Sequence, residues 1–165
     1  SVTVHLGEPR THATATGDPL RPLNHYAITK FYGEQVAWWY ANAGRLSTVC
    51  WRLGQPYPVD FFGLSHLDKP ENRTLAVTSR DLAAGFAAGL TADLSQDDWP
   101  DADRDRSAGH LRPIAGFALG HLVSASDVPA PTGYDLTVSA RLGYEPRDRM
   151  TSRGPVPRGG DGGGG

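Results

Sequence analysis

Residues 21–58 read RPLNHYAITKFYGEQVAWWYANAGRLSTVCWRLGQPYP, and this stretch decides the fold. From Asn24 to Ala43 apolar residues recur every three or four positions, which predicts a helix. Asn24 is a favourable N-cap, and Gly44 is suited to end the helix. The largely apolar residues 46–53 that follow are typical of a strand covered on both faces. A helix, a glycine and a buried strand in this order predict the second half of a βαβ unit.

Working outward from this stretch, the remaining chain alternates short strands with helices. Residues 2–5 are β-branched and apolar, and predict the end of a strand. Thr78 or Ser79 can cap a second helix that runs to about Leu90. Residues 121–125 predict another strand, and residues 137–142 a short helix stopped by Gly143. The sequence therefore predicts a mixed α/β fold over residues 1–150, followed by a disordered, glycine-rich tail at 151–165.

The composition narrows the classes of function. The 165 residues are 39% apolar and carry a formal net charge of −2, which argues against a dedicated nucleic-acid-binding protein. No run of apolar residues is long enough to span a membrane. Cys50 is the only cysteine, so no internal disulfide and no Cys-x-x-Cys metal site are expected, and the histidines show no metal spacing. We predict no metal, no nucleic acid and no membrane association. The chain begins at Ser1 and its only methionine is Met150, so we expect the natural beginning to lie upstream.

Tyr26 and Lys30 are the residues most suggestive of chemistry. They are four positions apart in the predicted helix and therefore share one face. An ammonium beside a phenol stabilises the phenolate, which makes tyrosine usable as a general acid or base. Considered alone, the pair is weak evidence, because a chance pair on a solvated helix face would have the same spacing.

The surroundings of this pair resemble the extended short-chain dehydrogenase/reductases, the NAD-dependent epimerase/dehydratase family. The matching features are Arg21-Pro22 before the tyrosine, Thr29-Lys30, Gly33-Glu34, and Arg52-x-Gly54 at the end of the strand. Further on, residues 78–82, 121–127 and 140–146 resemble the family's later segments, including a closing Leu-Gly-Tyr-x-Pro signature. The branch most similar is that of the uronate dehydrogenases. The resemblance implies the C-terminal part of a Rossmann-like, doubly wound parallel sheet with a small substrate-binding lobe.

The resemblance also implies roles for individual residues. Tyr26 would be the acid/base, Lys30 would bind the nicotinamide ribose, and Ser1, which lies 25 residues before Tyr26, would bind the reacting oxygen. The backbone at Gly54, Gln55 and Pro56 would lie beside the nicotinamide of NAD or NADP. Arg73 is our candidate for gripping substrate oxygens or a carboxylate, because its planar fork suits that task.

As a whole, the resemblance implies a cytoplasmic oxidoreductase or epimerase of carbohydrate metabolism that acts on a sugar, uronic acid or nucleotide sugar. A homodimer through the Tyr26 helix is also implied. The family's N-terminal Gly-x-x-Gly-x-x-Gly turn has no counterpart in the sequence, so the cofactor half is expected to be missing. The alternative is a non-catalytic fragment or interaction module that retains part of the fold. Hydride-transfer dehydrogenases, epimerases and dehydratases share every residue named above.

Overall fold

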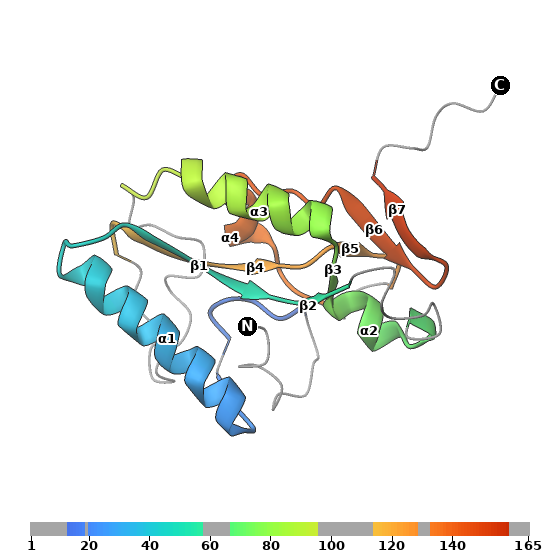
Figure 1. Cartoon of the computed structure of the whole chain (residues 1–165), viewed down its shortest axis with the longest axis horizontal. Helices are drawn as coiled ribbons and strands as arrows, with labels where there is room; N and C mark the ends of the chain where they lie inside the picture. The colour runs from blue at the N-terminus through green and yellow to red at the C-terminus, as the bar shows by residue number, and fades with distance from the viewer. Residues whose placement is uncertain (1–12, 19, 58–66, 96–113, 129–132, 159–165) are drawn as a thin grey trace.

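The computed structural model describes residues 13–18, 20–57, 67–95, 114–128 and 133–158. Helices and strands alternate along most of this part of the chain, as the sequence predicts (Figure 1). The elements are α1 (His25–Asn42), β1 (Thr48–Leu53), β2 (Gln55–Pro56), α2 (Pro70–Leu75), β3 (Ala76–Val77), α3 (Ser79–Thr91), β4 (Phe117–Leu122), β5 (Ala125–Ser126), α4 (Thr137–Arg141), β6 (Asp148–Thr151) and β7 (Gly154–Pro157). The predicted strand at residues 2–5 lies outside the described residues.

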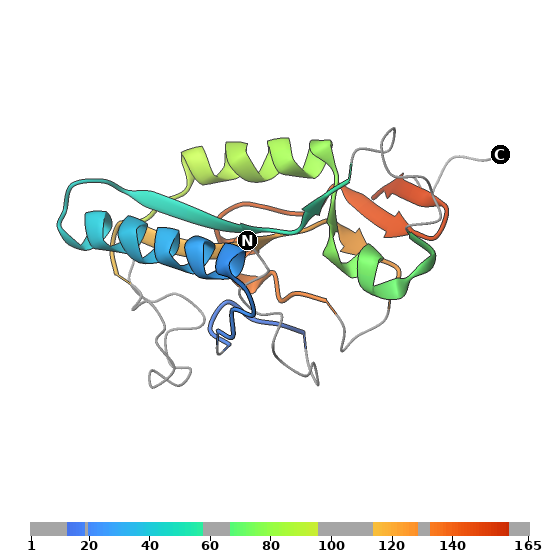
Figure 2. The same ribbon diagram turned by 60° about the horizontal axis from the view of Figure 1, so that its bottom comes forward.

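Parallel strand pairs form the centre of the molecule. β1 pairs with β4 from Thr48 opposite Phe117 to Leu53 opposite Leu122, and β2 pairs with β3. Helices α1 and α3 lie on opposite faces of the β1–β4 pair (Figures 1 and 2). Parallel strands with helices on both faces confirm the predicted α/β class and match part of a Rossmann-like fold. A smaller unit lies beyond the ends of these strands, where β6 pairs with both β5 and β7.

The local signals at the helix ends were predicted correctly. The Asn24 side chain accepts a hydrogen bond from the Ala27 amide at 2.9 Å, and Gly44 has a φ of +66° after the last turn of α1. Thr78 caps α3 by accepting from the Asp81 amide at 3.1 Å. The helix α2 was not predicted from the sequence, and it begins at Pro70, a residue that is suited to the first turn of a helix.

The large apolar residues of α1 do not face the sheet. Ile28, Tyr32 and Trp39 are 49%, 69% and 53% exposed in the described part of the chain. The face of α1 that is buried instead carries Ala27, Glu34 and Ala41. Small residues let the helix lie close to the sheet, while the large apolar residues point away from it.

The predicted tail from Thr151 is also corrected. Residues 151–157 form the turn and second strand of an antiparallel hairpin, with Thr151 opposite Gly154 and Asp148 opposite Pro157. Met150 on β6 is fully buried against Tyr57, Leu67 and Ala76, and this contact fixes the hairpin against β3 and the segment that follows β2. Within the hairpin, Gly154 has a φ of +112°, a conformation that favours glycine. Residues 159–165 lie outside the described residues.

A buried polar network joins α3 to the smaller unit. Asp81 is fully buried and accepts hydrogen bonds from the Ser124 hydroxyl at 2.5 Å and the Arg147 amide at 2.6 Å. The Thr78 hydroxyl donates to Asp148 at 2.7 Å. A buried carboxylate needs such donors to offset its lost hydration, so these bonds fix β6 relative to the start of α3.

Two titratable groups in the core, His121 and Cys50, are held neutral. Burial, with the nearby Arg52 charge, lowers the pKa of His121 to about 3. Burial, with the Glu34 charge, raises the pKa of the Cys50 thiol to about 11. Cys50 is therefore a poor nucleophile at neutral pH, as expected for a cysteine in a largely buried strand. No helix in the described ranges is long and apolar enough to cross a membrane.

Candidate functional site

Tyr26 and Lys30 are presented by the first turns of α1. The Asn24 cap begins the helix immediately before them. The Lys30 ammonium lies 5.0 Å from the centroid of the Tyr26 ring, within the range of a cation–π contact. Tyr26 is 54% exposed, so its hydroxyl is accessible to a ligand. The predicted pairing of these two residues on one helix face is therefore present in the structure.

The Gly54, Gln55 and Pro56 segment lies at the carboxyl end of β1. Gln55 and Pro56 form β2 and are exposed, while the Gly54 amide donates to the Leu122 carbonyl at 3.0 Å. A Cβ atom on Gly54 would stand 2.1 Å from the Leu75 carbonyl oxygen and 2.8 Å from a Val123 methyl. Only glycine fits here, because the backbone passes directly against the end of α2.

The two segments lie toward the same end of the sheet. α1 runs antiparallel to β1, so its first turns lie toward the strand's carboxyl end (Figures 1 and 2). In open α/β sheets, ligands bind outside the carboxyl ends of the strands. This end, with Tyr26, Lys30 and the Gly54–Gln55–Pro56 segment, is the candidate site.

A buried ion pair fixes α1 against β1 below the candidate site. The Arg52 guanidinium donates from Nε and Nη2 to the two carboxylate oxygens of Glu34, both at 2.9 Å. Its Nη1 donates to the Thr16 carbonyl at 2.9 Å. Arg52 and Glu34 are 1% and 5% exposed. Glu34 and Arg52 both belong to the motifs named in the sequence analysis, Gly33-Glu34 and Arg52-x-Gly54. An arginine within an otherwise apolar strand indicates a buried partner for its charge, and this was the signal for the ion pair.

Arg73 is engaged within the smaller unit. Its Nε donates to Asp127 at 2.8 Å, and its Nη1 donates to the Leu67 carbonyl at 2.6 Å. These bonds tie α2 to the segment that follows β5, so the structure accounts for Arg73 without a ligand. A substrate-gripping role for Arg73 stays a prediction. Ser1, the other predicted substrate contact, lies outside the described residues.

Replacing Gly54 by alanine is expected to destabilise the protein by about 3 kcal/mol or more, because the added methyl meets a backbone oxygen that has no room to move. The free energy of unfolding in urea measures this. Gly33→Ala is the matched control, since nothing lies within 4 Å of a Cβ there. That change is expected to stabilise α1 by about 0.5–1 kcal/mol. Equal stabilities of the two variants would contradict the tight packing described for Gly54.

Comparison with known proteins shows which family part of this chain is similar to. The profile of the NAD dependent epimerase/dehydratase family matches residues 4–84. No curated protein sequence matches the chain significantly. Taken with the Rossmann-like fold, the profile match shows that residues 4–84 are similar to the NAD-dependent epimerase/dehydratase family.

Solved structures share the fold. Uronate dehydrogenase from Agrobacterium tumefaciens is 21% identical with a TM-score of 0.58, and the match covers 93% of this chain and 49% of that one. Glucuronic acid dehydrogenase from Chromohalobacter salexigens is 20% identical with a TM-score of 0.56, covering 86% and 42%. A mutant of the Agrobacterium protein complexed with NAD gives the same agreement as its parent. The chain thus spans less than half the length of these proteins.

Proposed function

We propose that the protein is an NAD- or NADP-dependent oxidoreductase that acts on a sugar, with a uronic acid as the favoured substrate class. The observation that carries the proposal is the exposed Tyr26–Lys30 pair at the carboxyl end of β1. The similarity in fold to uronate and glucuronic acid dehydrogenases favours a uronic acid over a nucleotide sugar.

The described residues fit the nicotinamide end of such a cofactor. Lys30 offers ammonium donors and Tyr26 offers a phenol, and the exposed β2 segment lies toward the same end of the sheet (Figure 1). When bound, the cofactor accepts or delivers a hydride. The Tyr26 hydroxyl oxygen takes up or returns the proton of the sugar hydroxyl, and the Lys30 ammonium stabilises the phenolate while this happens. By resemblance, Ser1 would orient the reacting oxygen.

The assembly is also part of the proposal. Tyr32, Val36 and Trp39 are exposed on α1 and line a hollow of about 500 Å³. The Gln35 amide nitrogen is buried beside them and has no hydrogen-bond partner among the described residues. Large apolar side chains in this arrangement favour an interface. We place a second copy of the chain on this face. The single domain predicted over residues 1–150 extends to at least Pro157, because β7 pairs with β6.

Cofactor titration tests the function. NAD and NADP are titrated into this chain and into a version extended upstream of Ser1, followed by reduction assays with glucuronate and other sugars. Saturable cofactor binding and uronate-dependent reduction by the extended version are expected. Absence of binding in both versions would remove the enzyme proposal.

A non-catalytic module is the second candidate, because the chain spans less than half of the solved structures it matches. Thermal unfolding separates the two possibilities. A cooperative transition of the isolated chain without cofactor binding favours the module, whereas a molten or aggregating chain indicates a severed enzyme.

A further inference from the structure

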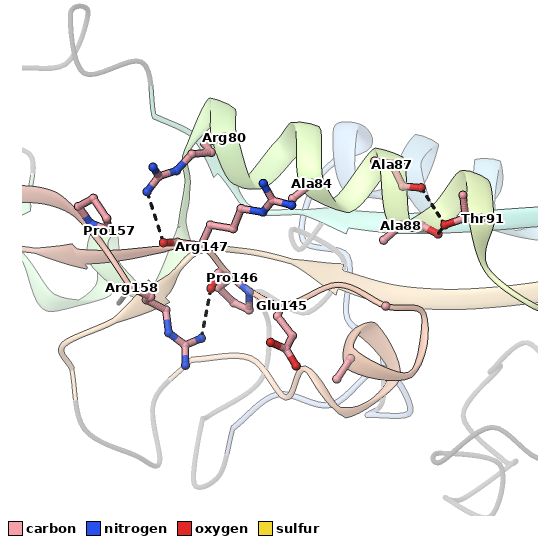
Figure 3. Close-up of a pocket in the computed structure, with 12 residues that line it drawn as sticks. Arg80, Ala84, Ala87, Ala88, Thr91, Glu145, Pro146, Arg147, Pro157 and Arg158 are labelled. Atoms are coloured by element: carbon pink, nitrogen blue, oxygen red, sulfur yellow. Dashed lines mark hydrogen bonds between the residues drawn. The ribbon is translucent and has the colours of Figure 1, made fainter. Parts of the chain in front are cut away.

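A second hollow lies between α3 and the β6–β7 hairpin. It has a volume of about 890 Å³, within the usual size range of small-molecule sites. α3 provides one wall, and the segments around α4, β6 and β7 provide the other (Figure 3). No residue of α1, β1 or β2 lines it. Because α1 and α3 lie on opposite faces of the β1–β4 pair, the hollow is separate from the candidate site (Figure 2).

Three arginines from three segments line this hollow, which we call the arginine groove. Figure 3 shows Arg80 on α3, Arg147 before β6 and Arg158 after β7. Residues 141–158 carry five arginines against two acidic residues, although the whole chain has a net charge of −2. The groove is therefore locally positive on a weakly acidic protein.

The three guanidinium groups differ in how they are compensated. Arg80 forms an ion pair with Asp148, which orients it and offsets its charge. Arg158 donates to the Pro146 carbonyl at 3.3 Å, a neutral partner. The Arg147 backbone is held by Asp81, while its exposed side chain makes no polar contact with another described residue. Two guanidinium charges thus face a groove in which Glu145 is the one lining carboxylate in the described chain.

The rest of the lining limits what the groove can hold. Its walls include the small residues Ala84, Ala87, Ala88 and Gly143, which leave room for a compact ligand. None of the described lining residues is aromatic, so the groove offers no surface on which a nucleobase would stack. Glu145 and the Thr91 hydroxyl can accept hydrogen bonds from hydroxyl groups. Arg147 and Arg158 both line the groove, and each guanidinium can bind phosphate oxygens through parallel N–H donors.

We infer that the arginine groove binds a small phosphorylated polyol, such as a sugar phosphate, at a site distinct from the Tyr26 site. Arg147 and Arg158 hold the phosphate, with Arg80 fixed beside them by Asp148. Glu145 accepts hydrogen bonds from the polyol hydroxyls. The groove is thereby a second ligand site on the opposite face of the sheet from α1.

Calorimetric titration of the full chain with glucose 6-phosphate tests the inference. Saturable binding to one site is expected, weakening as salt is added. Arg147→Gln and Arg158→Gln are each expected to weaken binding by about tenfold or more, because each removes a charged hydrogen-bond donor. Arg149→Gln is the matched control, since Arg149 is exposed on β6 but does not line the groove. It should bind as the unmodified chain does.

Further titrations show whether the phosphate group, the sugar hydroxyls or a carboxylate is responsible for binding. Inorganic phosphate and glucose are each expected to bind more weakly than glucose 6-phosphate, and glucuronate more weakly than the phosphate ester. Tyr26→Phe should leave glucose 6-phosphate binding unchanged, which distinguishes this site from the proposed active site. Lack of saturable binding overturns the inference, as does equal affinity for inorganic phosphate or glucuronate. Unaltered binding by both Arg147→Gln and Arg158→Gln, with unfolding midpoints showing that both variants fold, also overturns it.

Discussion

Replacing Arg52 by methionine is expected to lower the free energy of unfolding by about 3–5 kcal/mol, because it leaves the buried Glu34 carboxylate without its partner. The Thr16 carbonyl loses its donor in the same variant. Urea denaturation, followed by the helical signal in circular dichroism, measures the loss. Glu34→Leu should cost a similar amount, since it strands the guanidinium in the same site.

The double variant Glu34→Leu with Arg52→Met separates charge pairing from burial. Two apolar residues of similar size remove both desolvated charges, so most of the lost stability is expected to return. Asp127→Ala is the control for a more exposed pair, because the Asp127 side chain is 36% exposed and its bond to Arg73 is partly screened. It is expected to cost about 1 kcal/mol or less. Similar losses for Arg52→Met and Asp127→Ala would contradict the account of the buried pair.

The position of this ion pair links stability to the candidate site. Glu34 lies one helical turn after Lys30, and Arg52 lies two residues before Gly54. The pair therefore holds the helix that carries Tyr26 and Lys30 against the strand that leads into β2. A bidentate contact fixes the orientation of both partners as well as their separation. The register between the proposed acid/base and the Gly54 turn depends on this contact.

Signals confined to a few neighbouring residues could be predicted from the sequence. The Asn24 cap, the Gly44 and Gly143 turns and the start of α3 at Thr78 are each determined within a few residues, and all are present. The Tyr26–Lys30 pair belongs to the same class, because helix geometry alone places residues four apart on one face.

Features that depend on distant parts of the chain were predicted less well. The apolar spacing of α1 predicts a helix but does not show which face contacts the sheet, and the buried face carries Ala27, Glu34 and Ala41. The Glu34–Arg52 contact joins residues 18 positions apart and has no periodic signature. The β7 strand was not predicted, because Pro155 and Pro157 are unusual in a strand. Its pairing with β6 accompanies the burial of Met150 against distant residues, which the local sequence does not show. The arginine groove combines segments from α3 to Arg158, which only the fold brings together.

Tyr26→Phe is expected to reduce the turnover of the cofactor-binding form by about 100- to 10,000-fold, the usual contribution of a positioned general acid/base. The substrate KM and the cofactor affinity should change little, because the aromatic ring remains in place and only the hydroxyl is lost. The cation–π contact with Lys30 is also retained by phenylalanine. Steady-state kinetics with a uronic acid and NAD measure the effect, and the unfolding midpoint verifies that the exposed position tolerates the change.

Tyr32→Phe provides the matched control on the same helix. Tyr32 is 69% exposed and lies with Trp39 on the outward apolar face, away from the carboxyl end of β1. Its loss of a hydroxyl should leave turnover within about twofold of the unmodified protein, because an exposed phenol outside the site makes no transition-state contact. If Tyr26→Phe retained most of its turnover, or if both variants lost it equally, the proton would have to be moved by another group. The proposed role of the Tyr26–Lys30 pair would then fail, while the description of the fold would be unaffected.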